Sequence, residues 1–121
     1  MPVCHRHGKG PVDCIMRIIM LAAIVYGCLV TTAAQAQETR IRLGYTFAQS
    51  QCGSCHAVGV VGESPLQIAP PFRSLHKRYP VEYLAEALAE GIVTGHPAMP
   101  RFELDVVQIG DLIAYLKSLE P

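Results

Sequence analysis

A five-residue motif, Cys52-Gly53-Ser54-Cys55-His56, constrains this chain more than any other feature. The pattern C-x-x-C-H is typical of covalent haem attachment. In such sites two thiols add to the two vinyl groups of the macrocycle, and the histidine that follows ligates the iron. Gly53 and Ser54 are small, so the macrocycle can approach the backbone. The motif therefore predicts one haem c, attached through Cys52 and Cys55, with His56 as an iron ligand.

Three other interpretations of the two cysteines are weaker. A thioredoxin-like pair needs a strand–helix–strand context, and no run of this sequence alternates as a strand does. A structural zinc site needs four ligands, so His76 or His96 would have to join the motif without a familiar spacing. A disulfide between Cys52 and Cys55 would close too short a loop to stabilise the chain much. Haem attachment is the best explanation, and it requires a second axial ligand elsewhere.

The first third of the chain has the pattern of a leader. Ile18 to Val30 contains no charge, Arg17 precedes it, and Ala34 and Ala36 give a small-x-small ending. A basic flank, a short apolar run and such an ending are typical of a secretory signal peptide, so we expect cleavage after Ala36. The alternative is a retained membrane anchor, but spanning a bilayer takes about 20 apolar residues. We expect residues 1–36 to be removed and the mature protein to be periplasmic and not membrane-spanning.

The start of translation is a separate prediction. Residues 1–15 contain two histidines, two cysteines, two prolines and an aspartate, which is unusual before a signal peptide. A start at Met16 would place Arg17 and the apolar run immediately after the first residue. We therefore expect translation to begin at Met16. Only Cys52 and Cys55 then remain in the mature protein.

Removal of the leader also changes the charge. The chain has ten basic and ten acidic residues, of which Arg6, Lys9, Arg17 and Asp13 lie in residues 1–36. The mature part therefore has a net charge of −2. Phosphate binding needs an excess of Lys and Arg, so we expect no nucleic-acid partner.

The remaining residues, 37–121, have helical patterns separated by loops. Thr39–Ser50 is amphipathic, residues 81–90 lie between Pro80 and Gly91, and a last helix is expected to begin at Asp105, with Gln108 completing the cap. In that last helix an apolar stripe follows the helical period, formed by Ile109, Leu112, Ile113 and Leu116. The patterns predict an all-α fold of three to four short helices.

Residues 37–121 resemble the class I monohaem cytochromes c, especially the small bacterial kind. The motif follows a helix containing Gly44, Phe47 and Ala48, residues 95–100 (Gly-His-Pro-Ala-Met-Pro) resemble the loop with the axial methionine, and residues 111–119 resemble the C-terminal helix. The resemblance implies a cytochrome c fold wrapped around one covalently bound haem. It also implies that Gly44 packs near Tyr115, where the first and last helices cross.

Met99 is the expected sixth iron ligand. It is the one methionine left after residue 36, and it stands in a Pro-rich loop where a core-filling methionine is less expected. A thioether is a soft ligand suited to ferrous haem, and His/Met ligation raises the reduction potential. The alternative ligand is His96, three residues earlier.

The resemblance also implies groups around the cofactor. A proline carbonyl, from Pro70 or Pro71, would accept the free imidazole N–H of His56 and orient the ring. The haem propionates need hydrogen-bond donors where they are buried, and the sequence offers Arg73, Tyr79 and Arg101.

Two strong axial ligands leave no open iron position, which disfavours substrate chemistry and favours electron transfer. The resemblance implies a non-enzymatic electron carrier that cycles between Fe(III) and Fe(II) and exchanges electrons with redox protein partners such as a dehydrogenase, a reductase or an oxidase. One alternative is a dedicated cytochrome c subunit of an oxidoreductase complex. Another is a haem sensor in which CO or NO displaces Met99.

Overall fold

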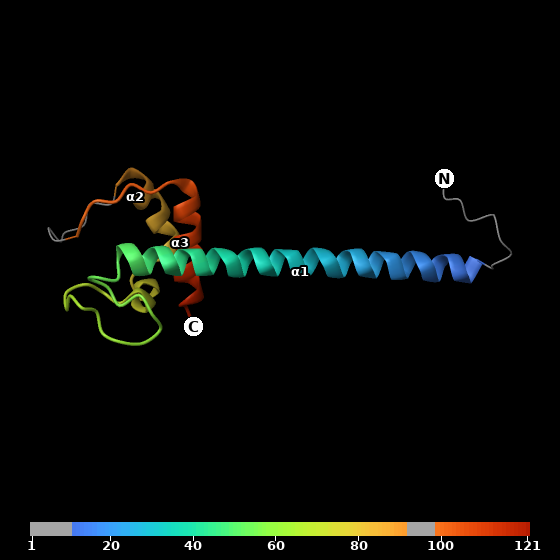
Figure 1. Cartoon of the computed structure of the whole chain (residues 1–121), viewed down its shortest axis with the longest axis horizontal. Coiled ribbons are helices and arrows are strands. Elements are labelled where there is room, and N and C mark those ends of the chain that lie inside the picture. The colour runs from blue at the N-terminus through green and yellow to red at the C-terminus, as the bar shows by residue number, and fades with distance from the viewer. Residues whose placement is uncertain (1–10, 92–98) are drawn as a thin grey trace. The chain divides into compact units, whose positions relative to one another are not determined.

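The fold is helical throughout the part that can be described. The computed structural model describes residues 11–91 and 99–121, and these contain no β-strand. The elements, in chain order, are α1 (Pro11–Gln51), the 3-10 helices η1 (Phe72–Lys77) and η2 (Val81–Tyr83), α2 (Leu84–Glu90) and α3 (Val106–Ser118) (Figure 1). The predicted all-α class is confirmed for this part of the chain.

The first helix is longer than the sequence pattern predicted. Instead of Thr39–Ser50, α1 covers Pro11–Gln51, because Ala, Leu and Ile in the leader favour a helix and no proline interrupts it. The chain nevertheless divides into two compact units, residues 1–36 and 37–121, which are described separately. Within the described residues, one helical stretch, Ile15–Gln51, is long and apolar enough to cross a membrane. The large apolar side chains of the leader are exposed.

The second α-helix begins later than predicted. Pro80 precedes the helical turns with extended backbone angles instead of occupying the first helical position, and Tyr83 N–H donates to Pro80 O at 3.1 Å. Since this is a bond between residues three apart, Val81–Tyr83 is a 3-10 turn, and α2 proper starts at Leu84. Gly91 ends α2 with a φ of 86°, a conformation that favours glycine, so the predicted stop is confirmed.

The predicted start of α3 is also confirmed. Asp105 Oδ1 accepts the backbone N–H groups of Val107 and Gln108, both at 2.8 Å, and Gln108 Oε1 accepts the N–H of Asp105 at 3.1 Å. This reciprocal pair is a capping box. From the stripe on α3, Leu112 and Leu116 are buried in a core that also contains Ala48, Val58, Phe72, Leu75, Val81, Leu88 and Tyr115.

The last turns of α1 cross α3 at very short range, as Figure 1 shows. A Cβ added to Gly44 would lie 2.0 Å from the backbone oxygen of Asp111 and 2.8 Å from Cβ of Tyr115. The predicted packing of Gly44 near Tyr115 is therefore confirmed. Beside the crossing, Arg40 Nε lies 3.3 Å from Asp111 Oδ1, and the ring of Tyr45 meets Tyr115 edge-on.

Tyr115 also ties α3 to the residues that follow the cysteine motif. Its hydroxyl donates a hydrogen bond of 2.6 Å to the carbonyl oxygen of Val58, and both residues are buried. Burial, and to a smaller extent Tyr45, raises the pKa of the Tyr115 phenol above its ordinary value. The phenol therefore stays protonated, and able to donate, over the whole neutral range.

We predict that Gly44→Ala destabilises the protein by about 3 kcal/mol, because the added methyl group forces the two helix backbones apart. Urea denaturation of the purified holoprotein measures the loss. Gly59→Ala is the matched control, since a Cβ there would meet only Val61 O, at an ordinary 3.8 Å, and its effect should stay below about 1 kcal/mol. Equal effects of the two substitutions would contradict the close crossing.

We predict that Tyr115→Phe costs about 1–2 kcal/mol at neutral pH, because Val58 O loses its donor. In the unfolded chain the phenol ionises near pH 10, and in the folded chain it ionises at higher pH. The stabilisation by Tyr115 is therefore complete below about pH 10 and is lost as the pH rises through the raised pKa.

Denaturation of both forms over a pH series checks this dependence. The exposed Tyr83, replaced by Phe, serves as the control, and its replacement should leave the stability at neutral pH nearly unchanged. A stability difference between wild type and Tyr115→Phe that stayed constant up to high pH would show that the folded pKa is not raised.

Candidate functional site

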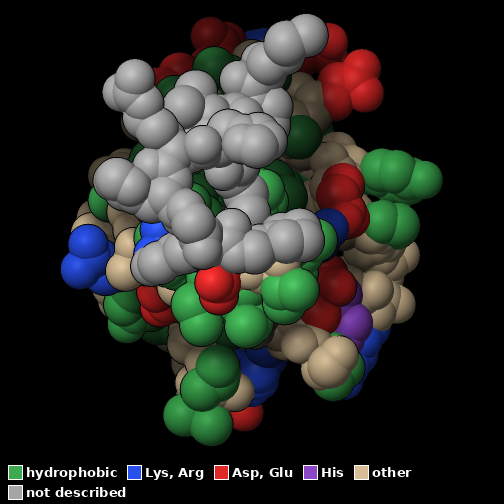
Figure 2. Space-filling model, turned by 90° about the vertical axis from the view of Figure 1, so that its right-hand side faces the viewer, with side chains coloured by type: hydrophobic (Ala, Val, Ile, Leu, Met, Phe, Trp, Pro, Cys, Tyr) green, Lys and Arg blue, Asp and Glu red, His purple; other side chains and the backbone are tan. Residues whose placement is uncertain are grey.

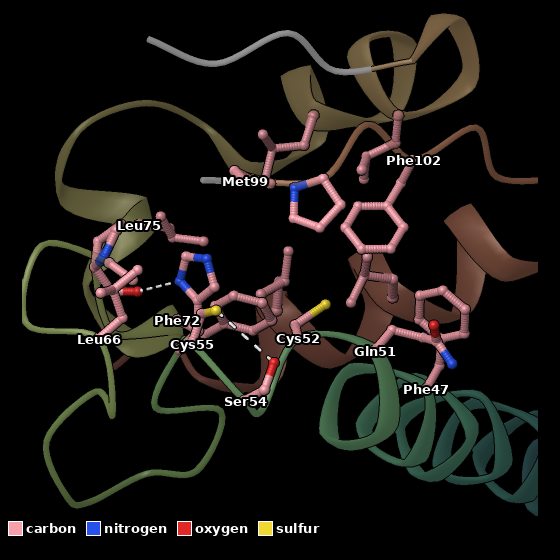
Figure 3. Close-up of a pocket in the computed structure, with 18 of the residues that line it drawn as sticks. Phe47, Gln51, Cys52, Ser54, Cys55, Leu66, Phe72, Leu75, Met99 and Phe102 are labelled. Carbon is pink, nitrogen blue, oxygen red and sulfur yellow. Dashed lines mark hydrogen bonds between the residues drawn. The ribbon is translucent and has the colours of Figure 1, made fainter. Parts of the chain in front are cut away.

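A mostly apolar cavity of about 300 Å³ lies in the unit formed by residues 37–121. The end of α1, the following turn, η1, α2, α3 and the segment before α3 all contribute to its wall (Figure 3). The lining consists of Phe47, Gln51, Cys52, Ser54, Cys55, His56, Leu66, Ile68, Ala69, Pro70, Phe72, Leu75, Arg78, Tyr79, Leu84, Leu88, Met99, Pro100, Phe102, Leu104, Leu112 and Leu116. Its volume is at the lower end of the range for ligand pockets in proteins.

The cysteine motif forms a tight turn directly after α1. Cys52 N–H still donates to Ala48 O at 2.8 Å, and the N–H groups of Cys55 and His56 both donate to Cys52 O, at 3.1 and 2.9 Å. A Cβ on Gly53 would lie 2.5 Å from Gln49 O, so the turn itself requires glycine there. This is a different reason from the one the sequence suggested, which was space for a bound group.

Both thiols of the motif are free, partly buried and part of the cavity wall. Burial, together with the nearby Cys55, raises the pKa of the Cys52 thiol to about 11. A buried thiolate is therefore disfavoured at neutral pH, whereas an uncharged sulfur is tolerated. A thioether is such an uncharged sulfur, so the site is suited to covalent attachment at Cys52.

A backbone carbonyl fixes the tautomer of His56. Its Nδ1 lies 2.8 Å from the carbonyl oxygen of Pro70, drawn as a dashed line in Figure 3, and a carbonyl can only accept a hydrogen bond. Nδ1 therefore carries the proton, and in the neutral ring Nε2 keeps a lone pair for a metal. The ring also packs against Phe72, with centroids 5.1 Å apart. Of the two prolines that the sequence left open, Pro70 makes this contact.

Backbone bonds hold the loop that supplies this carbonyl. Phe72 N–H donates to Ala57 O at 3.0 Å, and Ala57 N–H donates to the buried hydroxyl of Ser64 at 2.9 Å. Sequence reasoning missed Ser64, because one serine in a Gly- and Pro-rich loop carries no signal of burial. Its effect is to keep the chain on either side of His56 close to the Pro70 turn.

Met99 lines the cavity together with Pro100. In Figure 3 it lies across the cavity from the labelled Cys52 and Cys55. The motif and Met99 are far apart in the sequence, and the fold brings them to one cavity. His96, the alternative ligand, lies outside the described residues.

The three predicted propionate donors occupy different places. Tyr79 lines the cavity. Arg73 borders a separate surface hollow, beside His76, and its buried Nη1 atom has no hydrogen-bond partner among the described residues. Arg101 lies over the end of α2, where its Nη2 donates to Glu90 O at 3.1 Å. Neither arginine belongs to the described wall of the cavity.

Sequence reasoning missed Arg78, the one Lys or Arg side chain in that wall. It lies three residues after Leu75, which in turn lies three after Phe72, and all three residues line the cavity. In a 3-10 helix, side chains three apart share a face. Recognition of the 3-10 spacing in residues 72–77 would have identified Arg78, but the sequence contains no clear signal for that helix type.

The donor set suits a haem group. Two free thiols, an imidazole with an available Nε2, a thioether, a guanidinium and a phenol line a mostly apolar space. The thiols are suited to covalent attachment, the nitrogen and the thioether are ligands that haem iron accepts, and Arg78 and Tyr79 would be donors to its carboxylates.

Comparison with known proteins agrees with this chemistry. Residues 39–116 match the family model described as cytochrome C oxidase, cbb3-type, subunit III. A curated protein named cytochrome c-552, from Bradyrhizobium diazoefficiens, is 32% identical over 98 residues, which cover 78% of this chain and 92% of that protein. No solved structure matches the chain. The matched range contains the cysteine motif and Met99.

Proposed function

The chain belongs to the cytochrome c family, and from this premise we propose that residues 37–121 form an exported carrier of single electrons, with one covalent haem ligated by His56 and Met99. Haem-based electron transfer is the function of the family as a whole, whose members are carriers and not enzymes. The observation that carries the finer proposal is the shared cavity: two free thiols, an imidazole and a thioether meet in one apolar wall.

Each of these side chains has a separate part in holding the group. Cys52 and Cys55 attach it covalently, and His56, oriented by Pro70 O, offers Nε2 to the metal. Met99 would supply a neutral, soft sulfur as a second iron ligand. When bound, haem supplies an iron that changes between the ferric and ferrous states.

The rest of the wall supports electron transfer and disfavours other chemistry. Apolar side chains such as Leu75, Leu112 and Phe102 exclude water from the space between the ligands. With His56 and Met99 both bound to the iron, no position would be left for a substrate. Arg78 and Tyr79 supply the donors for haem carboxylates, and the charge of Arg78 offsets theirs.

We propose that residues 1–36 are a signal peptide that directs the protein to the periplasm. The apolar run and the small residues Ala34 and Ala36 support this proposal, and Gln37 is also the first residue of the second compact unit. The helical stretch Ile15–Gln51 supports retention as an anchor equally well by length, so cleavage must be measured.

We propose that the redox partner is another protein. In the one face drawn in Figure 2, acidic and basic side chains form separate small groups, and neither kind covers that face. The description of the matching family model, an oxidase subunit, favours a second candidate function, that of a dedicated cytochrome c subunit of an oxidoreductase complex. Co-purification with a larger redox protein would favour that candidate, and isolation as a lone monomer with a reversible potential would favour the free carrier.

The first prediction concerns the ligand set. A haem-stained gel should show covalent haem on the unmodified protein, and its oxidised form should show the weak near-infrared band of thioether–iron ligation. Met99→Ala should remove this band and lower the reduction potential, because a sulfur ligand favours the ferrous state. Val61→Ala, at an exposed position outside this wall, should leave both unchanged.

Two results would contradict the ligand set. Absence of covalent haem would contradict the whole proposal. Absence of the near-infrared band from the unmodified protein would show that a residue other than Met99, such as His96, is the sixth iron ligand.

The second prediction concerns the leader. Mass spectrometry of the purified haem protein should find Gln37 as the first residue. Ala36→Phe should block cleavage, because a bulky side chain does not fit a small-residue position, whereas Gln35→Phe, at the neighbouring unrestricted position, should be processed normally. A wild-type protein recovered from membranes with residues 16–36 still attached would establish the anchor instead.

A further inference from the structure

The segment that contains Met99 is hydrogen-bonded to the end of α2. The helix α2 ends at Glu90, and Met99 lies in the segment that precedes α3. Two hydrogen bonds join these two parts: Leu104 N–H donates to Leu88 O at 2.9 Å, and Arg101 Nη2 donates to Glu90 O at 3.1 Å. Of the two ties, the one made by Arg101 is nearer to Met99 in sequence, only two residues away.

The contact of Arg101 with the end of α2 depends on glycine. A Cβ added to Gly91 would lie 2.4 Å from Nε of Arg101 and 3.1 Å from Nη2, so the guanidinium occupies the space of a missing side chain. The carbonyl of Glu90 is one of the last in α2 and has no partner within the helix. A cation at a helix C-terminus is also favoured by the helix dipole. The guanidinium therefore caps α2.

Charge pairing contributes little to this contact. Arg101 Nη2 lies 3.9 Å from Glu103 Oε1, and the two side chains are 62% and 70% exposed. Exposed ion pairs of this kind add little stability. The contact between Arg101 and the end of α2 therefore consists of the hydrogen bond to Glu90 O and the packing of the guanidinium over Gly91.

We propose that Arg101 is a positioning residue that holds Met99 in place as an axial ligand. This rests on the proposed ligation by Met99. A methionine side chain is long and flexible, so the fraction of time for which its sulfur occupies a metal site depends on how closely the backbone is held. The bond to Glu90 O restrains Arg101, two residues from Met99, more closely than the bond of Leu104 alone would, and this lowers the entropy cost of bringing Met99 to the site.

The structure thus gives Arg101 a different role from the one expected from the sequence. It was a predicted donor to the haem carboxylates, but the described contacts direct its guanidinium to the end of α2. It acts on the cofactor only through the backbone of the segment that includes Met99.

The test uses Arg101→Ala in the full haem-loaded protein, with CO as the probe. Carbon monoxide binds reduced haem only when Met99 is displaced, so its rate of binding measures how often the sulfur leaves. We expect this rate to rise about fivefold, the loss of roughly one hydrogen bond, and amide hydrogen exchange in the last turn of α2 to become faster. Arg101→Lys, which retains a donor and a charge, should recover part of the wild-type rate.

Glu103→Gln is the matched control, because it removes the exposed ion pair and leaves the bond to Glu90 O in place. Its CO-binding rate should equal that of the wild type.

The outcomes separate this inference from the proposed function. A near-infrared thioether–iron band in the unmodified protein, combined with CO-binding rates that are the same in wild type and Arg101→Ala, would overturn the role of Arg101 alone. Absence of that band from the unmodified protein would overturn ligation by Met99, and the role of Arg101 with it.

Discussion

The close crossing of α1 and α3 is the constraint on which the rest of the domain depends. Because Gly44 has no side chain, the backbone of α3 reaches van der Waals distance of α1, and Ala48 and Leu112 then fill the core beside it. Beyond the crossing α1 continues to Gln51, and the turn with Cys52 follows it directly. The glycine thus allows α3, which supplies Leu112 and Leu116 to the cavity wall, to pack closely against the helix that precedes the cysteine turn.

The cavity wall has two halves that come from different parts of the chain. Residues 47–79 supply the thiols, the imidazole, the Pro70 carbonyl and the guanidinium of Arg78, and residues 84–116 supply the thioether. Both parts also supply apolar side chains. The first half is held by local bonds such as those of Ala57 and Ser64. The second is held at the ends of helices, by the cap of α3 and by Arg101 on α2. Both halves are therefore held by specific polar contacts.

Features that depend on nearby residues could be predicted from the sequence. The cysteine motif, the capping box at Asp105 and the helix stop at Gly91 each rest on chemistry within a few residues, and the resemblance added the crossing at Gly44. The features that the sequence did not reveal depend on contacts between distant parts of the fold or on the type of helix. The choice of Pro70, the burial of Ser64 and the inward position of Arg78 follow from the 3-10 geometry of residues 72–77 and from the loop before it, for which the sequence has no clear pattern. Family membership is confirmed, and the ligand roles of the site residues remain predictions.

The bond between Tyr115 and Val58 has a consequence for the order of events during biosynthesis. The cysteine turn is synthesised about fifty residues before the helix that covers it, so the residues that close the site do not yet exist when the thiols first emerge. Until α3 packs into place, the Cys52 thiol lacks part of the burial that raises its pKa, and the cavity wall has no Leu112 or Leu116. The bond between Tyr115 and Val58 can form only when the last helix has folded, so the cavity around the two thiols is closed at the end of folding.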